Sequence, residues 1–362
     1  MDLTFEKFNF VGELPSQRKL FIECFPENIE TPVEGEIHYK WKFHSFPSKM
    51  ELNAYEYVAK IGEDLVGYYA ALPYEYVIEG QPHQVAMVCD VMTGVKARGK
   101  GVFTKLGIYS TEQFNAEGFS FSTGYPIRPD VIPGHKKVGW TFPFQIPMYG
   151  KFIRMNAFLT SRGKSFLIPF ANIAISVYSN IISLFTGLGF RNLIIQQYSS
   201  KQIDEINGLD LFFSRWIREQ KIALNKNREF LKWRLGAPEK EYTIITVQQG
   251  NDIIGYAVFR KVEKLGVPCL GILDFCLLDS YNGASALLIR KITQVAKEEK
   301  AELILMMMMK NNAAKYGVLR QGFLKTPYPF SFITKLYKNA PNQDIMFNEN
   351  NWSLMWIDSD DL

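Results

Sequence analysis

The sequence predicts an α/β protein built from two copies of one domain. Its 362 residues exceed what a single hydrophobic core usually supports, so two domains are expected. The segment GEDLVGYYA at 62–70 is matched by GNDIIGYAV at 250–258, and both read as a hairpin turn followed by an apolar strand. Because further landmarks recur in the same order, we interpret the chain as an internal duplication.

These further landmarks lie on both sides of the hairpins. From Gly101 to Gly139 the chain runs 38 residues, and the same separation divides Ala284 from Gly322. Each match is weak alone, but the shared order favours a duplicated domain over chance. The other matched segments are YKWKF with LKWRL (39–43 and 231–235) and VGW with QGF (138–140 and 321–323).

Each copy is predicted to contain the same elements in one order. An extended strand pair comes first, followed by a mostly apolar strand, a helix and another strand; a short helix and a final strand close the copy. The central strand–helix–strand unit predicts one parallel crossover in an α/β order. In the first copy the strand, helix and strand of this unit are expected at 85–93, about 101–117 and 119–125. In the second copy they are expected at 269–278, about 283–300 and 301–309.

The composition narrows the class of protein. Apolar residues make up 47% and charged residues 22%, as in soluble globular proteins, and a net charge of +4 without a long basic run argues against nucleic acid as a partner. The four cysteines show no CxxC spacing, so neither a disulfide framework nor a metal site is expected. The start of the chain, MDLTFEKFNF, does not resemble a signal peptide. A cytoplasmic protein is therefore predicted.

The uncharged segment 165–190 lies between the two copies. Its length alone would permit a membrane span, but polar residues recur in it at helical spacing, and Pro169, Gly187 and Gly189 shorten the usable helix. A helix packed between the domains is favoured and no span is expected, while peripheral contact with a membrane stays open. The polar stripe consists of Asn172, Ser176, Ser179, Asn180 and Ser183.

The segment TGVKARGKGVFTKLG at 93–107 combines glycines with closely spaced cations. A strand precedes it and a helix begins within it, where unpaired amides and the helix dipole favour an anion. Gly99 and Gly101 permit close approach of the backbone, and Arg98 and Lys100 add positive charge, which predicts a phosphate or pyrophosphate site. Neither GxxxxGK[ST] nor GxGxxG is present, and a solvated basic turn is the alternative.

With this segment the sequence resembles the GNAT acyltransferases, whose signature is Gln/Arg-x-x-Gly-x-Gly/Ala after the central strand. Arg98 and Gly101 match the signature, whereas Phe103 departs from its small final residue. Gly139 and Trp140 resemble the Gly-aromatic pair that ends the family's acetyl-CoA-binding half. The resemblance implies two tandem GNAT domains, each a mixed, mostly antiparallel sheet with a splayed parallel strand pair and flanking helices.

The resemblance covers the first copy well and the second in layout only. It implies an acyl-CoA-binding, catalytic GNAT domain at 1–158, a linker with an apolar helix at 159–200 and a degenerate GNAT domain at 201–338. A tail follows at 339–362, and we expect its two tryptophans to dock.

The resemblance further implies acetyl-CoA as co-substrate, with no metal. The pantetheine arm would pair with the backbone of Val91, Met92 and Thr93, and Gly94 would suit a bulge in that strand. The pyrophosphate would be held by the segment Arg98, Gly99, Lys100, Gly101, Val102, Phe103 and Thr104. In the second copy the corresponding stretch, DSYNGASALL at 279–288, holds no Arg or Lys, so that copy is predicted to bind no CoA.

Two residues of the first copy are candidates for acid–base catalysis. His135 stands where the family usually has its general acid, a tyrosine four residues before the Gly-aromatic pair; the second copy has Val318 there. Asp90 interrupts the apolar run MVCDVM and is a candidate base, although Asp274 at the same place in the second copy favours a shared structural role.

The function implied is an acyl-CoA-dependent N-acyltransferase, with acetyl transfer to a primary amine by direct attack in a ternary complex favoured. Tyr125 and Arg128, just after the next strand, are candidates for contact with a small-molecule amine acceptor. The tail resembles those of tandem-GNAT proteins of surface-polysaccharide assembly, which suggests an amino sugar. An aminoacyl transferase of the peptidoglycan-bridge type and a non-catalytic acyl-CoA- or sugar-binding protein are the alternatives.

Overall fold

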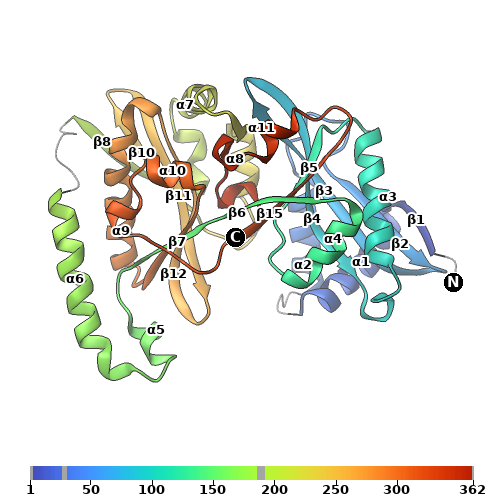
Figure 1. Ribbon diagram of the computed structural model, residues 1–362, viewed down its shortest axis with the longest axis horizontal. Helices are drawn as coiled ribbons and strands as arrows, with labels where there is room; N and C mark the ends of the chain where they lie inside the picture. The colour runs from blue at the N-terminus through green and yellow to red at the C-terminus, as the bar shows by residue number, and fades with distance from the viewer. Residues whose placement is uncertain (1–2, 27–30, 186–191, 361–362) are drawn as a thin grey trace. The chain divides into compact units, whose positions relative to one another are not determined.

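The computed structural model describes residues 3–26, 31–185 and 192–360, and the chain divides into two compact units (Figure 1). Unit 1 consists of Met1–Gln145 and Ser331–Glu349, and unit 2 of Ile146–Phe330 and Asn350–Leu362. Each unit holds a mixed, mostly antiparallel sheet that includes a central parallel strand pair and is flanked by helices, so the predicted fold class is confirmed.

The sheet of unit 1 has the strand order β1-β2-β3-β4-β5-β15-β6. The long hairpin of β3 and β4 is its centre, and Gly80 takes the left-handed conformation that its tight turn requires. The capping box between Thr31 and Glu34 starts α2. The elements are β1 (Leu3–Lys7), α1 (Phe10–Cys24), α2 (Pro32–Tyr39), β2 (Tyr55–Ile61), β3 (Asp64–Ile78), β4 (Gln81–Thr93), α3 (Val102–Ala116), β5 (Phe121–Gly124), α4 (Ile132–Val138) and β6 (Thr141–Ile146).

The parallel pair of unit 1 parts partway along β4. Strands β4 and β5 are paired from Val85 with Phe121 to Met87 with Thr123, whereas β4 continues to Thr93. Beyond Met87, β4 keeps its hydrogen-bonding partner β3 on one side only among the described residues. This is the splay that the resemblance implied, and it leaves backbone donors and acceptors of β4 available to an extended ligand.

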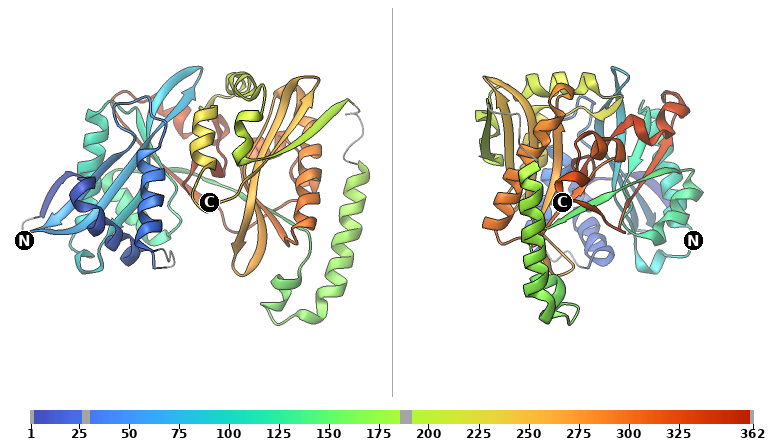
Figure 2. Two further views of the ribbon diagram at one scale, coloured as in Figure 1. Left: turned by 180° about the vertical axis from the view of Figure 1, so that it is seen from behind. Right: turned by 60° about the vertical axis from the view of Figure 1, so that its left-hand side comes forward.

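The sheet of unit 2 has the order β14-β7-β13-β12-β11-β10-β8, with β12 and β13 as its parallel pair. Helix α6 lies on the outside of this unit (Figure 2). The elements are β7 (Met148–Phe152), α5 (Asn156–Thr160), α6 (Ile168–Phe185), β8 (Leu193–Ser199), α7 (Leu209–Trp216), β9 (Ile222–Leu224), α8 (Arg228–Leu235), β10 (Thr243–Gln249), β11 (Asp252–Lys264), β12 (Val267–Leu277), α9 (Ser285–Glu298), β13 (Leu303–Met307), α10 (Lys310–Lys315) and β14 (Leu324–Lys325).

The closing strands of the two copies are exchanged. Strand β7, which follows the first copy in sequence, pairs with β13 of unit 2, and β15 (Phe330–Leu336), which follows the second copy, pairs with β5 of unit 1. Lys335 on β15 fixes the latter strand, because its Nζ donates to Thr111 Oγ1 and to the carbonyl of Val138, both at 2.8 Å.

This exchange shifts the domain boundaries away from those expected from the sequence. Residues 146–158 were expected in the first domain and belong to unit 2, while residues 331–338 were expected in the second domain and belong to unit 1. The physical reason is that strands with the same two-residue alternation can pair in either sheet, so local sequence does not choose between them.

The C-terminal segment docks on unit 2, as its tryptophans predicted. After α11 (Gln343–Phe347), strand β16 (Trp352–Ser353) pairs in parallel with β9, and Met355 forms an antiparallel bridge with Met308. Trp356 is 1% exposed, and its ring lies 5.7 Å from that of Phe330. The expected tail at 339–362 is therefore divided, since residues 339–349 belong to unit 1.

Candidate acyl-CoA site

The loop between β4 and α3 has an open backbone with two left-handed glycines. Gly99 and Gly101 have φ angles of 76° and 77°, in the left-handed region that favours glycine. A Cβ built at Gly99 would meet no heavy atom within 4 Å, so open space adjoins the backbone there. Gly101 is the N-cap of α3 and supplies no side-chain acceptor to the first amides of the helix.

Free donors and cations meet at this loop. Within the part of the chain that the structure describes, no group accepts a hydrogen bond from the backbone amides at 101–104. The side chains of Lys96, Arg98 and Lys100 are exposed around them, and Arg98 Nε donates to the carbonyl of Thr93 at 3.4 Å. The arrangement can therefore hold a doubly charged anion such as a pyrophosphate.

The unexpected aromatic residue of the loop motif, Phe103, packs against α4. A Cβ at Gly134 would lie only 2.6 Å from the ring of Phe103, so glycine at that position makes room for the phenylalanine. The same ring meets His135 edge-on, with centroids 5.1 Å apart. The side chains of Val102 and Phe103 belong to the core or pack against it, which leaves their amides as the groups that can face a ligand.

His135 is a buried residue of the core rather than an exposed one. It is 5% exposed and lies between Phe103 and Trp140, whose rings meet the imidazole edge-on. Burial lowers the pKa of His135 to about 4, and no hydrogen-bond partner is found for its Nδ1 among the described residues. At neutral pH the imidazole is uncharged, so this placement disfavours the acid role expected from the sequence.

Asp90 lies in a β-bulge of the central strand. Tyr68 pairs with Met92 and Ala70 with Cys89, so β4 contains an extra residue at this point. The φ angle of Asp90 is 48°, a strained conformation for a residue other than glycine. Its carboxylate accepts a hydrogen bond from Lys42 Nζ at 2.8 Å, and both side chains are about 85% buried (15% and 14% exposed).

The backbone expected to pair with pantetheine follows this bulge. Met92 is buried and pairs with Tyr68, while Val91 and Thr93 are partly exposed. The next residue, Gly94, has its amide bonded to the carbonyl of Val66 at 2.9 Å, so the chain leaves β4 in a fixed direction toward the loop.

A second carboxylate beside the bulge is absent from the sequence-based candidates. Glu56 on β2 accepts hydrogen bonds at Oε1 from the hydroxyl groups of Tyr39, at 2.6 Å, and Tyr68. Burial raises the pKa of Glu56 to about 7, although the two hydroxyls act to lower it, and the charge of Asp90 raises it further. No described residue donates to its Oε2, so one oxygen can accept a proton.

Glu56 could not be recognised from the sequence because core-facing and outward-facing residues alternate along β2, and Glu56 is at an outward-facing position. Tyr55, Tyr57 and Ala59 face the core, which places Glu56 on the face that a single strand pattern assigns to solvent. The hydroxyl of Tyr39, at the end of α2, lies over that face instead. The only local hint is a charged residue between two large aromatic ones.

The candidate acceptor residues lie after β5. Tyr125 is 8% exposed, its hydroxyl lies 3.3 Å from that of Tyr76, and its ring contacts Phe332. Arg128 is half exposed and forms an ion pair with Asp130 at 2.8 Å. The structure thus places Tyr125 in the packed end of β5 and Arg128 in the exposed segment that follows.

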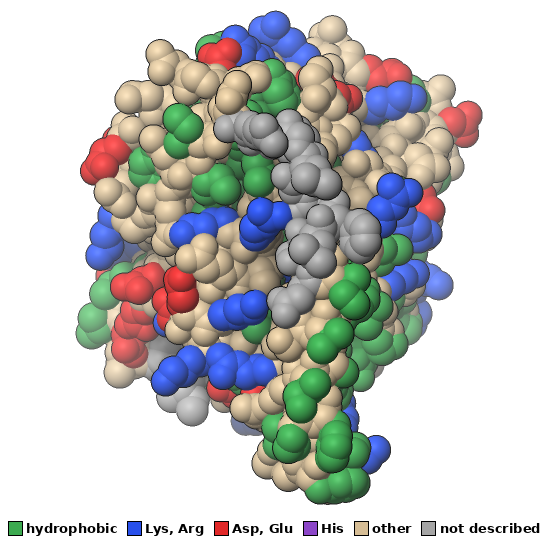
Figure 3. All heavy atoms as spheres, turned by 90° about the vertical axis from the view of Figure 1, so that its left-hand side faces the viewer, with side chains coloured by type: hydrophobic (Ala, Val, Ile, Leu, Met, Phe, Trp, Pro, Cys, Tyr) green, Lys and Arg blue, Asp and Glu red, His purple; other side chains and the backbone are tan. Residues whose placement is uncertain are grey.

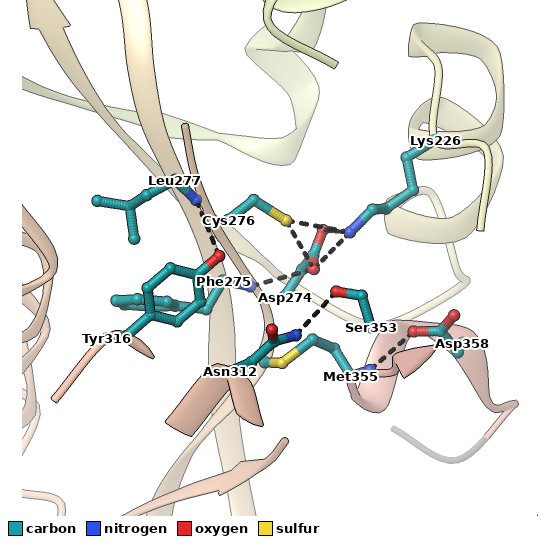
Figure 4. A network of polar contacts seen from close by, with 10 residues as sticks. All are labelled: Lys226, Asp274, Phe275, Cys276, Leu277, Asn312, Tyr316, Ser353, Met355 and Asp358. Carbon is teal, nitrogen blue, oxygen red and sulfur yellow. Dashed lines mark hydrogen bonds and ion pairs between the residues drawn. The ribbon is translucent and has the colours of Figure 1, made fainter. Parts of the chain in front are cut away.

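The second copy repeats the ion pair but not the rest of the site. Lys226 Nζ lies 2.8 Å from both carboxylate oxygens of Asp274, 48 residues apart in sequence, as are Lys42 and Asp90 (Figure 4). Burial opposes the charge on Lys226, but the Asp274 carboxylate and the Cys276 sulfur outweigh it and raise the pKa of the amine.

The second copy lacks counterparts of the Glu56 carboxylate and of the glycine-rich β4–α3 loop. Ile244, which pairs with Val258 as Glu56 pairs with Ala70, is fully buried and carries no acid. In the loop that follows β12, Asp279 donates its amide to Glu219 and pairs with Lys315, and no residue from 279 to 284 is left-handed. The loop therefore lacks both the charge and the backbone of its counterpart.

The tail occupies the parting strands of unit 2. Strands β12 and β13 pair from Cys269 with Leu303 to Ile272 with Met306, and just beyond β13 Met308 bridges to Met355. The turn that follows, Trp356–Asp358, packs on β12, and Met355 donates its amide to Asp358 (Figure 4). The splay that is open toward β5 in unit 1 is thus covered by the chain itself in unit 2.

Comparison with known families agrees with this geometry. Residues 12–142 match the model of the acetyltransferase (GNAT) domain, and residues 208–323 match that of the acetyltransferase (GNAT) family. The chain belongs to the GNAT family. It carries two GNAT domains in tandem, which confirms the resemblance inferred from the sequence and supports acyltransferase activity.

Solved structures share the fold over nearly the whole chain. A probable N-acyltransferase from Enterococcus faecalis V583, described as a conserved protein of unknown function, matches with a TM-score of 0.67 and 13% identity over 94% of this chain and 74% of its own. GCN5-related N-acetyltransferases from Kribbella flavida (11% identity, 92% of this chain, 71% of that one) and Anabaena variabilis ATCC 29413 (12%, 92% and 73%) both give TM-scores of 0.63. No curated protein matches the sequence.

Proposed function

We propose that unit 1 of this GNAT protein transfers an acetyl group from acetyl-CoA to a primary amine, and that unit 2 binds no CoA. The observation that carries the proposal is the β4–α3 loop, where left-handed glycines, unpaired amides and three exposed cations follow a strand that parts from its parallel neighbour. These are the features that suit a pyrophosphate joined to an extended chain.

Specific residues would hold the acyl-CoA molecule. The backbone of Val91–Thr93 would pair with the pantetheine arm, and the amides of Gly101–Thr104 would bind the pyrophosphate together with Arg98 and Lys100. The side chains of Val102 and Phe103 would not contribute, because they pack in the core. Tyr125 and Arg128 remain our candidates for the acceptor side.

We assign the proton acceptor to Glu56. An amine attacks a thioester carbonyl only as the free base, so its proton must leave as the new C–N bond forms and the C–S bond breaks. A general base works best when its pKa lies near the working pH, and Glu56 has a pKa of about 7 and an unoccupied Oε2. The proton would pass from the amine to this carboxylate, directly or through one water.

Asp90 and His135 receive other roles. The ion pair between Asp90 and Lys42 recurs as Asp274 and Lys226 in a copy without a phosphate loop, so we assign Asp90 to fixing the bulge rather than to base catalysis. His135 would set the spacing between α3 and α4 through Phe103. Much of the rate would then come from holding both reactants together, as in other bimolecular transfers.

Isothermal titration with acetyl-CoA, followed by a thiol-release assay across amines, tests the proposal. We expect one binding site per chain and CoA release with at least one class among nucleotide amino sugars, polyamines and peptides. Binding without release across the panel would instead favour a non-catalytic acyl-CoA-binding protein. Absence of acetyl-CoA binding would overturn the proposal.

A further inference from the structure

Helix α6 of unit 2 exposes its apolar residues instead of burying them. Phe170, Ile173, Val177 and Ile181 follow one another at intervals of three or four residues, and their exposed fractions run from 71% to 49%. Phe166, just before the helix, is 73% exposed on the same run. Side chains at this spacing lie on one face of a helix, so they form a continuous apolar strip.

The opposite face of α6 is the one that contacts its own domain. Asn172 accepts a hydrogen bond from the amide of Met155 and donates to Asn156, and Ile182 touches the position of Gly322. The polar stripe predicted from the sequence thus contacts unit 2 at Asn172, while Asn180 and Ser183 lie outside the described side chains. The exposed strip is left over after the helix has made its intramolecular contacts.

The chain around α6 carries positive charge only. From residue 146 to 203 the sequence contains no Asp or Glu, and its cations are Lys151, Arg154, Arg162, Lys164, Arg191 and Lys201. Arg162 and Lys164 are exposed immediately before the strip begins. Figure 3 shows hydrophobic side chains along the helix at the lower right of this face and Lys and Arg side chains on the surface beside it.

We propose that α6 is the docking element of this protein on an anionic phospholipid surface, with the helix lying flat in the interface. An apolar strip with bulky Phe and Ile, in a chain segment from residue 146 to 203 that holds Lys and Arg but no Asp or Glu, matches the two forces that hold such helices: burial of apolar area and attraction to anionic headgroups. No described helix is long and apolar enough to cross a membrane. A second copy of the chain is a poorer fit, since its equivalent surface would bring like charges together.

Co-sedimentation of the full chain with vesicles tests this inference independently of catalysis. Wild-type protein should pellet with vesicles of phosphatidylcholine mixed with phosphatidylglycerol, and less with phosphatidylcholine alone. The variant Phe170→Glu with Ile173→Glu should lose pelleting with both, because it places carboxylates on the strip. Leu211→Glu is the matched control on α7, where Leu211 is 49% exposed, and should pellet like wild type.

Charge reversal provides the second arm. Arg162→Glu with Lys164→Glu should remove the preference for phosphatidylglycerol, because the attraction to the headgroups is replaced by repulsion. High salt should remove the preference as well, because it screens that attraction. Wild-type protein that stays in the supernatant at low ionic strength would overturn the inference. So would unchanged pelleting of the Phe170/Ile173 variant, or a wild-type dimer in sedimentation equilibrium that this variant dissolves.

Discussion

The loops that follow the central strands of the two units have the same place in the fold and opposite properties. Residues 94–101 of unit 1 end in two left-handed glycines and leave amides unpaired before α3. Residues 279–284 of unit 2 form a turn in which the amide of Tyr281 donates to the carbonyl of Leu278 and the amide of Asp279 donates to the Glu219 carboxylate. The amide of Ser285, which follows the turn, donates back to its carbonyls. A GNAT sheet therefore forms in unit 2 without an open glycine loop of this kind, so the loop is not a requirement of the fold.

The differences extend from the loop into each sheet. The counterpart of Glu56 in unit 2 is Ile244. The counterpart of Tyr68 is Tyr256, whose buried hydroxyl lacks a hydrogen-bond partner among the described residues. The ion pair at the central strand is present in both units, but in unit 2 it is almost fully buried, and Lys226 lies over the ring of Trp216. Unit 2 therefore has packed structure at the places where unit 1 has a partly exposed ion pair and a carboxylate oxygen without a donor.

The largest effect is expected at the carboxylate that only unit 1 has. Glu56→Gln should lower kcat/KM by about 10²–10⁴-fold and remove the decline in activity below about pH 7, since activity needs Glu56 ionised. The pKa of Glu56 is raised in the folded protein, so its ionisation opposes folding at a pH above about 7. The variant, which carries no charge there, should therefore be at least as stable as wild type at pH 8. A pH–rate profile checks this, with Glu75→Gln on β3 as the control. An unchanged profile would exclude Glu56 as the base.

The two ion pairs should differ in their contribution to stability. Lys226→Met leaves Asp274 fully buried without its partner and should cost about 3–5 kcal/mol of unfolding free energy. Lys42→Met leaves a carboxylate that water still reaches in part and should cost about 1–2 kcal/mol. Urea denaturation of both variants measures the contrast, and equal losses would show that burial does not separate the pairs.

Negative charge introduced into each loop should affect acetyl-CoA binding only in the first copy. Arg98→Glu with Gly101→Glu should weaken acetyl-CoA binding by about 100-fold, because the proposed phosphate contacts would be replaced by repulsion and a left-handed position would be strained. Gly283→Glu in the second loop should leave the titration unchanged. Circular dichroism of the first variant verifies its fold, and equal weakening by the two changes would contradict a silent second loop.

The smallest effect is expected at His135. His135→Leu keeps the bulk of the side chain against Phe103 and should change stability at neutral pH by less than about 1.5 kcal/mol, with activity retained. Burial holds the pKa of His135 at about 4, below its ordinary 6.5, so wild type loses stability as pH falls between these values and the variant should not. Thermal unfolding from pH 7 to 4 checks this. A large loss of activity at pH 7 would restore the acid role.

Some features of the site could be read from the sequence because they depend on neighbours along the chain. The glycines, cations and helix start of 93–107 are contiguous, and their backbone conformations follow from residue type. Phe103 could not be explained in this way, because the space for its ring comes from Gly134, thirty-one positions later. Glu56 was missed for a similar reason, since Tyr39 and Tyr68 reach it from other elements.

The amino-acid sequence by itself determined the duplication, the α/β order and the glycine-rich basic loop, because each depends on a local pattern: a repeat, a hydrophobic period or a run of glycine and charge. Only the tertiary structure decided which sheet each closing strand completes, how α6 is oriented and which carboxylate has a pKa near neutrality. Those outcomes depend on burial and on partners distant in sequence, and a strand or helix pattern states that one face is apolar without stating what will cover it.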